Sequence, residues 1–154
     1  MAHETTAAQA IQFLRKLVDP TLIAERPALI AKLRPSHEDY AAIFVEGAAA
    51  QAEHAYQQQL WSTPVIWPIK SEQTEVHIRA AVSSDELLSD EAAAAALPGG
   101  YREIASLLQP GIVIIAFEIH AKADSAGLYF DGLVPRGDRF VWCPKPWRVV
   151  AAKE

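Results

Sequence analysis

The sequence is poor in the residues that form covalent or metal-bound frameworks. Its 154 residues include one cysteine, Cys143, so an internal disulfide cannot form. A single thiol is typical of a reducing compartment, and no histidine lies near Cys143 in the sequence to activate it as a nucleophile. Neither the Cys/His spacing of a zinc site nor a His-Glu-x-x-His helix occurs. We therefore expect no metal and no cofactor.

Motifs that identify common enzyme classes are also lacking. The chain has no Gly-x-Gly-x-x-Gly fingerprint, no P-loop and no Gly-x-Ser-x-Gly elbow. Nucleotide binding and serine hydrolysis lose their main support, because each depends on the backbone geometry that these motifs provide. The absence of these motifs favours a protein that is not an enzyme.

Charge and hydropathy exclude two further classes of partner. The net charge is -5 and no run of lysine or arginine occurs, which argues against binding nucleic acid or anionic lipid. No stretch approaches the roughly 18 consecutive apolar residues of a membrane span, and the N-terminus lacks the basic and apolar regions of a signal peptide. We expect a cytoplasmic protein without nucleic-acid or membrane partners, whose acidic charge favours a basic protein partner.

What is present is typical of a folded domain. Hydrophobic residues make up 51% of the chain and charged residues 21%. At this length we expect a single domain spanning residues 1–154. Helical patterns fill the first part of the chain, and strand patterns fill most of the rest. The sequence predicts an α+β fold in which N-terminal helices pack on a curved, mainly antiparallel sheet as a single pair of layers.

Two helices have recognisable starts. Thr6 and Gln9 form a capping box ahead of apolar residues at three-four spacing. Ser36 and Asp39 form another, which begins the longest predicted helix. Gly47 lies inside this second pattern, where glycine costs about 1 kcal/mol relative to alanine, and it marks the place of a bend.

The strand patterns come later in the chain. The predicted strands are 74–83, 112–121, 127–134 and 139–143. Residues 112–121 are apolar on both faces in their first half, which is typical of a central strand. Short helices are predicted within 84–96 and 101–108, whereas 63–68 should be extended because its two prolines disfavour helix.

Three polar residues are candidates for catalysis: Glu118, His120 and Asp131. Glu118 and His120 share a face of their strand and could form a proton-transfer pair. If Ala121 pairs with Gly127, the Asp131 side chain lies on the opposite face of the sheet from Glu118. A slip of one residue in the strand register would bring it to the same face. His77 would add a third group if its strand is the neighbour. The alternative interpretation is a strand that becomes polar where it emerges into solvent.

Tryptophan and proline are concentrated in two segments, 63–68 and 142–148. Proline fixes φ and cannot donate to a strand ladder, so both segments are predicted to be extended and to lie at an edge. Large rings at such an edge either close the core or form an interaction surface, and we expect at least one tryptophan to be buried. The predicted binding residues are Trp67, Tyr129, Trp142, Trp147 and Arg148.

Two resemblances add expectations. The order of helices first and a curved meander last resembles the cone-shaped α+β fold of the nuclear transport factor 2-like superfamily. Catalytic members of that superfamily place an Asp, His or Tyr in the cavity of the cone, which implies such a role for Asp131, His120 or Tyr129. The sequences DGLV at 131–134 and PKPWR at 144–148 are similar to the tail of small uncharacterised bacterial proteins. That second resemblance implies no activity.

These observations lead to one function hypothesis and two alternatives. The first is a non-enzymatic cytoplasmic binding protein, of the kind exemplified by bacterial immunity proteins, which recognises a basic effector protein through an acidic surface with aromatic anchors. The second is a small-molecule binder or an isomerase or dehydratase with a polar group in an apolar cone. The third is a homodimeric scaffold joined through the sheet.

Overall fold

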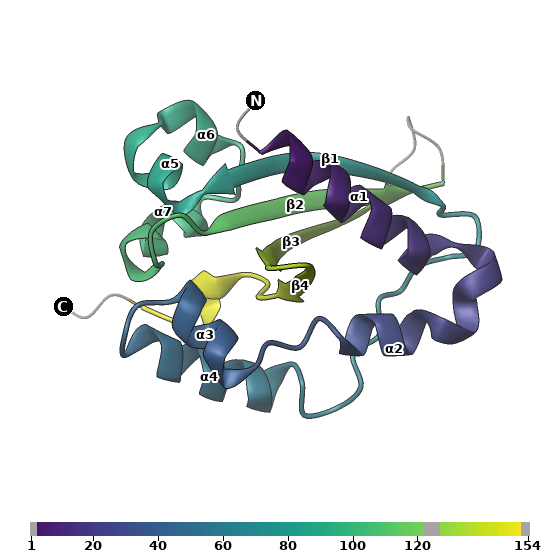
Figure 1. Ribbon diagram of the computed structural model, residues 1–154, viewed down its shortest axis with the longest axis horizontal. Helices are drawn as coiled ribbons and strands as arrows, with labels where there is room; N and C mark the ends of the chain where they lie inside the picture. Colours follow the sequence, from purple (N-terminus) through teal and green to yellow (C-terminus); the bar gives the residue numbers. More distant parts are fainter. Residues whose placement is uncertain (1–2, 122–126, 152–154) are drawn as a thin grey trace.

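Helices occupy the first part of the chain, and a four-stranded sheet, interrupted by short helices, occupies the second (Figure 1). The computed structural model describes residues 3–121 and 127–151. The α-helices are α1 (Glu4–Val18), α2 (Arg26–Ala31), α3 (His37–Ile43), α4 (Ala48–Gln59), α5 (Ser84–Ser89), α6 (Glu91–Ala95) and α7 (Gly100–Ile104). The strands are β1 (Glu75–Ser83), β2 (Val113–His120), β3 (Leu128–Arg136) and β4 (Arg139–Trp142). Short 3₁₀ turns cover Pro20–Glu25, Ala105–Leu107 and Pro146–Arg148.

The sheet has the order β1-β2-β3-β4, and every neighbouring pair is antiparallel. The central position predicted for β2 is therefore confirmed. Its register with β3 pairs Phe117 with Phe130 and Glu118 with Tyr129, and it shifts at an irregularity farther along the pair. Opposed residues share a face and side chains alternate along a strand, so Asp131, two residues beyond Tyr129, lies on the face of Glu118. Of the two registers that remained open from the sequence, the structure has the one in which Asp131 shares the face of Glu118.

Helices cover both faces of the sheet. On one face, α1 and α2 pack with Trp67 against Ile115 and Phe117 of β2. On the other face, α3 to α7 pack against Ile114 and Ala116 of the same strand. The α+β class is confirmed, but the single pair of layers is wrong. Consecutive β2 residues point in opposite directions, and apolar residues on both sides require a cover on both sides.

The first helix begins earlier than the sequence predicted. α1 starts at Glu4, so Thr6 lies inside the helix and its capping box does not form. His3 occupies the cap position, and its Nε2 lies 2.6 Å from a carboxylate oxygen of Glu86 at the start of α5. This tertiary contact holds the first turn in place of the predicted local cap.

The second predicted helix is divided into α3 and α4. Its start is confirmed, because the Ser36 hydroxyl and the Asp39 carboxylate each accept a hydrogen bond from the other residue's backbone N–H. The chain then leaves the helix at Phe44, which bridges to Leu108, and Gly47 adopts a φ of 90° before α4. α1 is therefore longer than α3 or α4. Within the described part of the chain, every helix falls short of the length and hydrophobicity that a membrane crossing requires.

The C-terminal segment turns back instead of continuing as an extended edge. Lys145 has a left-handed φ of 46°, and a 3₁₀ turn follows it. This turn places Trp147 against Gly100, where a Cβ would collide with the indole ring. The Trp147 and Tyr101 rings also meet edge to face, with centroids 5.1 Å apart. The predicted extended edge is wrong beyond Cys143, because close packing on α7 bends the chain.

Candidate functional site

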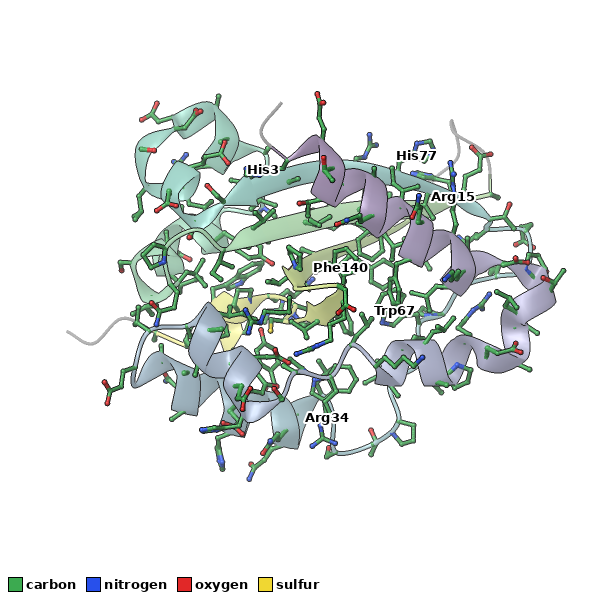
Figure 2. All side chains as sticks on the ribbon, in the orientation of Figure 1. His3, Arg15, Arg34, Trp67, His77 and Phe140 are labelled. Atoms are coloured by element: carbon green, nitrogen blue, oxygen red, sulfur yellow. The ribbon has the colours of Figure 1, made fainter. Side chains whose placement is uncertain are left out.

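Glu118 and His120 form a hydrogen-bonded pair at the end of β2, as their spacing predicted. A carboxylate oxygen of Glu118 lies 2.7 Å from His120 Nε2 and 2.7 Å from Arg79 Nη2. The His77 ring, opposite Glu118 on β1, meets the His120 ring edge to face at 5.2 Å. Figure 2 shows His77 at this end of the sheet. The neighbouring residues 122–126 lie outside the described part of the chain.

The electrostatics of Glu118 favour an ion pair with Arg79 over a role as general base. Burial works to raise the pKa of Glu118, but the hydrogen bonds from His120 and Arg79 outweigh it and hold the pKa below its usual value. A carboxylate stabilised in its charged form is a weak proton acceptor near neutral pH. The geometry therefore supports a polar sheet surface more than a catalytic pair.

Asp131 lies on the same face of the sheet but belongs to a different cluster. Its side chain is buried and accepts hydrogen bonds from the Tyr101 hydroxyl at 2.6 Å and from the Lys145 backbone N–H at 2.8 Å. The Lys145 ammonium lies 3.5 Å from its second oxygen. The Asp131 carbonyl accepts from Trp142 Nε1 at 2.8 Å. Asp131 therefore joins β3 to α7 and to the C-terminal turn.

Burial determines the chemistry around Asp131. Removal from water raises the pKa of Tyr101 well above its usual value, and the nearby Asp131 charge raises it further. Tyr101 therefore remains a hydrogen-bond donor. Among residues 3–121 and 127–151, no group of three His, Cys, Asp or Glu side chains is arranged to hold a metal ion.

The predicted binding residues do not form one surface. Trp67 and Trp142 are buried and meet edge to face, with ring centroids 5.1 Å apart. Trp147 belongs to the core on the opposite face of the sheet. Tyr129, which is 42% exposed, projects beside Glu118, and Arg148 is exposed after the last turn. The two Trp/Pro segments therefore meet through the rings of Trp67 and Trp142.

A groove with a cavity volume of about 600 Å³ lies between α2 and the extended segment 61–67. We call it the tryptophan groove, because Trp61 and Trp67 form part of its wall. Ile30 and Ala31 of α2 line the opposite side, and Ile66, on the rim, is 81% exposed. In Figure 1 the chain between α4 and β1 runs beside α2, where the groove lies. Pro64 within segment 61–67 and Pro68 directly after it explain why the segment forms no strand that would close the groove.

Two donors in the groove wall have no acceptor. The indole nitrogens of Trp61 and Trp67 are both buried, and neither makes a hydrogen bond within the described residues. A buried polar group without a partner costs about 1–3 kcal/mol. The third ring of this aromatic cluster, Trp142, differs because its N–H is bonded to the Asp131 carbonyl.

The charged residues that line the groove are both basic: Arg26 and Arg34. Arg26 Nε donates to the Leu17 carbonyl at 2.6 Å and its Nη1 to the Ile69 carbonyl at 3.4 Å, so this side chain ties the groove to α1. Arg34 is exposed; its backbone N–H donates to the Ala31 carbonyl at 3.2 Å, and its guanidinium makes no hydrogen bond or ion pair with the described residues. A positively charged rim is notable in a chain whose net charge is -5.

Sequence reasoning identified Trp67 but missed Trp61 and both arginines of the groove. Trp61 and Trp67 lie on either side of Pro64, and Pro68 follows Trp67, which was the available signal. Arg26 begins α2 and Arg34 follows it; neither belongs to a motif, and their convergence on the segment depends on tertiary packing.

Comparisons with protein-family models, with curated proteins and with solved structures find no match for this chain. The nuclear transport factor 2-like layout and the similarity of the C-terminal tail therefore stay predictions. Function has to be inferred from the groove and the polar clusters themselves.

Proposed function

We propose that this protein is a non-enzymatic binding protein that takes its ligand in the tryptophan groove. The observation that carries the proposal is the pair of buried indole N–H groups without acceptors in the wall of an open apolar groove. Ligand pockets commonly combine apolar and aromatic walls with a few polar groups, within a volume of about 300–1,000 Å³. The tryptophan groove has both properties.

The exposure of the groove rim supports the same function. Ile66 is 81% exposed although Trp67, the next residue, is 3% exposed. A ligand that lies along the groove would remove the Ile66 side chain from water, and burial of such a side chain is worth about 1.5–3 kcal/mol. Binding would therefore gain from surface that the free protein leaves exposed.

The polar clusters give less support to an enzyme. Glu118 is held in its charged form by Arg79 and His120, and Asp131 is bonded to Tyr101 and Lys145. Neither carboxylate lines the tryptophan groove. The isomerase or dehydratase alternative requires a polar group placed in an apolar cavity with its substrate.

A basic protein partner would need a different surface. Arg26 and Arg34 repel cationic groups at the groove, whereas exposed acidic residues lie on or beside the short helices α5 to α7. These residues are Asp85, Asp90, Glu91 and Glu103. Recognition of a basic effector, with the immunity-type role that it would imply, stays a proposal for that second surface.

The groove can be blocked by one substitution. In Ala31→Trp a large ring fills the groove from α2, and Ala28→Trp places the same ring on an exposed position of α2 outside the lining. The neutral apolar dye Nile red, which fluoresces when it leaves water, is titrated into each protein. We expect binding to the wild type and to Ala28→Trp, and at least a tenfold loss of affinity in Ala31→Trp. Equal binding to both variants, or no binding to the wild type, would refute the proposal.

A further inference from the structure

We infer that the ligand of the tryptophan groove is an amphipathic carboxylate, with its apolar body along the groove and its carboxylate at Arg34. This inference rests on the proposed function and adds the chemical class of the ligand. No sequence motif marks such a site, because two separate segments of the chain form it and they meet only in the fold.

Arg34 is the available cation of the groove. The Arg26 side chain donates to the backbone carbonyls of Leu17 and Ile69, whereas the Arg34 guanidinium makes no hydrogen bond or ion pair with the described residues. A guanidinium presents a planar set of donors that matches the two oxygens of a carboxylate. Figure 2 shows Arg34 and Trp67 on the same side of α1, and both line the groove.

Charge complementarity selects an anion over a neutral or cationic ligand. The lining contains two arginines and no acidic residue, although acidic residues outnumber basic ones, 19 to 14, in the whole chain. The remaining lining is apolar or weakly polar, with Ile30, Val65 and Ile66 along the length of the groove. A guanidinium that is unpaired among the described residues, in the lining of an apolar groove, matches a single negative charge on an apolar body.

The indole N–H groups of Trp61 and Trp67 offer the ligand a second hydrogen bond, and their resonances would report its binding. Both nitrogens are buried and unpartnered among the described residues, and we expect one ring to turn on ligand entry so that an acceptor reaches its N–H. Carboxylate oxygens accept several hydrogen bonds at once, and an alcohol accepts fewer. The carboxylate therefore gains from Arg34 and from an indole N–H that has no acceptor in the free protein.

The test uses three probes with the same ten-carbon chain: decanoate, decan-1-ol and decylammonium. Each is titrated by calorimetry below its aggregation concentration into the wild type, Arg34→Gln and Arg15→Gln. Arg15 is exposed on α1 outside the groove lining, and in Figure 2 it lies on the far side of Trp67 from Arg34. Thermal unfolding checks that each variant is folded.

We expect decanoate to bind at least fivefold more tightly than decan-1-ol, and decylammonium to bind more weakly than either. Arg34→Gln should weaken decanoate at least fivefold and leave decan-1-ol within twofold, whereas Arg15→Gln should change neither. Higher salt should weaken decanoate selectively, because the rim is exposed. Equal affinity for decanoate and decan-1-ol, or an equal loss of both in Arg34→Gln, would overturn the inference.

The outcome also separates this inference from the proposed function. If Nile red binding is lost in Ala31→Trp but the three probes bind equally, the groove is a binding site and the carboxylate assignment is wrong. If Nile red binding does not respond to Ala31→Trp, the groove is not the binding site and both proposals fail.

Discussion

Two buried clusters on opposite sides of the sheet differ in how their hydrogen-bonding groups are satisfied, although the Asp131 side also contains one buried hydroxyl, that of Tyr40, without a partner among the described residues. On one side, Asp131 is 2% exposed, and its side chain is bonded to Tyr101 and to Lys145. On the other side, Trp61 and Trp67 hold buried indole N–H groups that have no acceptor. Both clusters lie in well-packed aromatic surroundings, so burial alone does not explain the difference.

The difference distinguishes structural polar groups from groups kept for a ligand. A satisfied buried network fixes one arrangement of the chain, and removing one member leaves the others unpaired. An unsatisfied donor has a cost in the free protein that a ligand acceptor can remove. The Asp131 cluster is therefore interpreted as structural, and the tryptophan groove as the place where binding is to be sought.

The largest effect is expected when the satisfied cluster is broken. Asp131→Ala would leave the Tyr101 hydroxyl and the Lys145 backbone N–H without their acceptor, so we expect a loss of about 3 kcal/mol in the free energy of unfolding, measured with urea. Asp138→Ala, at an exposed position of the β3–β4 turn, should change it by about 0.5 kcal/mol or less. Similar unfolding curves for the two variants would show that Asp131 has no such structural role.

The buried carboxylate of Asp39 also tests whether a satisfied polar network stabilises the fold, here through the dependence of stability on pH. Burial works to raise the pKa of Asp39, but hydrogen bonds from Arg139, from the Ser36 N–H and from Arg136 hold it well below its usual range. The unfolded chain, with an Asp pKa of about 3.9, takes up the proton first. The stability that the Asp39 charge contributes is therefore present above about pH 4 and is lost as the pH falls further.

We accordingly expect Asp39→Asn to lower the free energy of unfolding by about 2 kcal/mol at pH 7. The difference in free energy of unfolding between the variant and the wild type should become smaller below pH 4. Urea unfolding at several pH values measures both. Glu38→Gln, an exposed substitution in the same helical turn, should follow the wild-type curve. If the stability difference between Asp39→Asn and the wild type does not change with pH, the Asp39 charge does not contribute to the stability of the fold.

The smallest effect is expected from a comparison of Trp67 with Trp142, whose rings are in contact. Trp67→Phe and Trp142→Phe each shorten a buried ring, but only Trp142 donates a hydrogen bond, to the Asp131 carbonyl. We expect Trp142→Phe to be less stable than Trp67→Phe by about 1 kcal/mol, because it leaves that carbonyl short of a donor. If Trp67→Phe is the less stable variant, the Trp67 indole has an acceptor that the structure does not show.

The parts of the fold set by local chemistry were predictable from sequence. Ser36 and Asp39 start α3 as their spacing predicts, and the apolar stretch of β2 is central in the sheet. The Thr6 capping box was wrong because a distant contact, His3 with Glu86, extends α1. The Trp/Pro tail was wrong beyond Cys143 because packing on α7 bends it.

The candidate site was less predictable for a related reason. Glu118 and His120 are neighbours along one strand, so a period of two residues is enough to pair them. Arg34 and Trp67 are far apart in the sequence, and no periodicity links a residue after α2 to an extended segment beyond α4. Whether an indole N–H finds an acceptor also depends on packing, and composition carries no signal for it.

The most direct test of the account follows the indole N–H groups by nuclear magnetic resonance. The protein has four tryptophans, and the Trp61→Phe and Trp67→Phe variants assign the two resonances of the groove in a nitrogen-15 spectrum. On titration with decanoate, the Trp61 or Trp67 indole proton should move downfield as it gains an acceptor, while the Trp142 indole, already bonded to Asp131, stays in place. Groove resonances that do not move at saturating decanoate, or a Trp142 resonance that moves as far, would contradict the account.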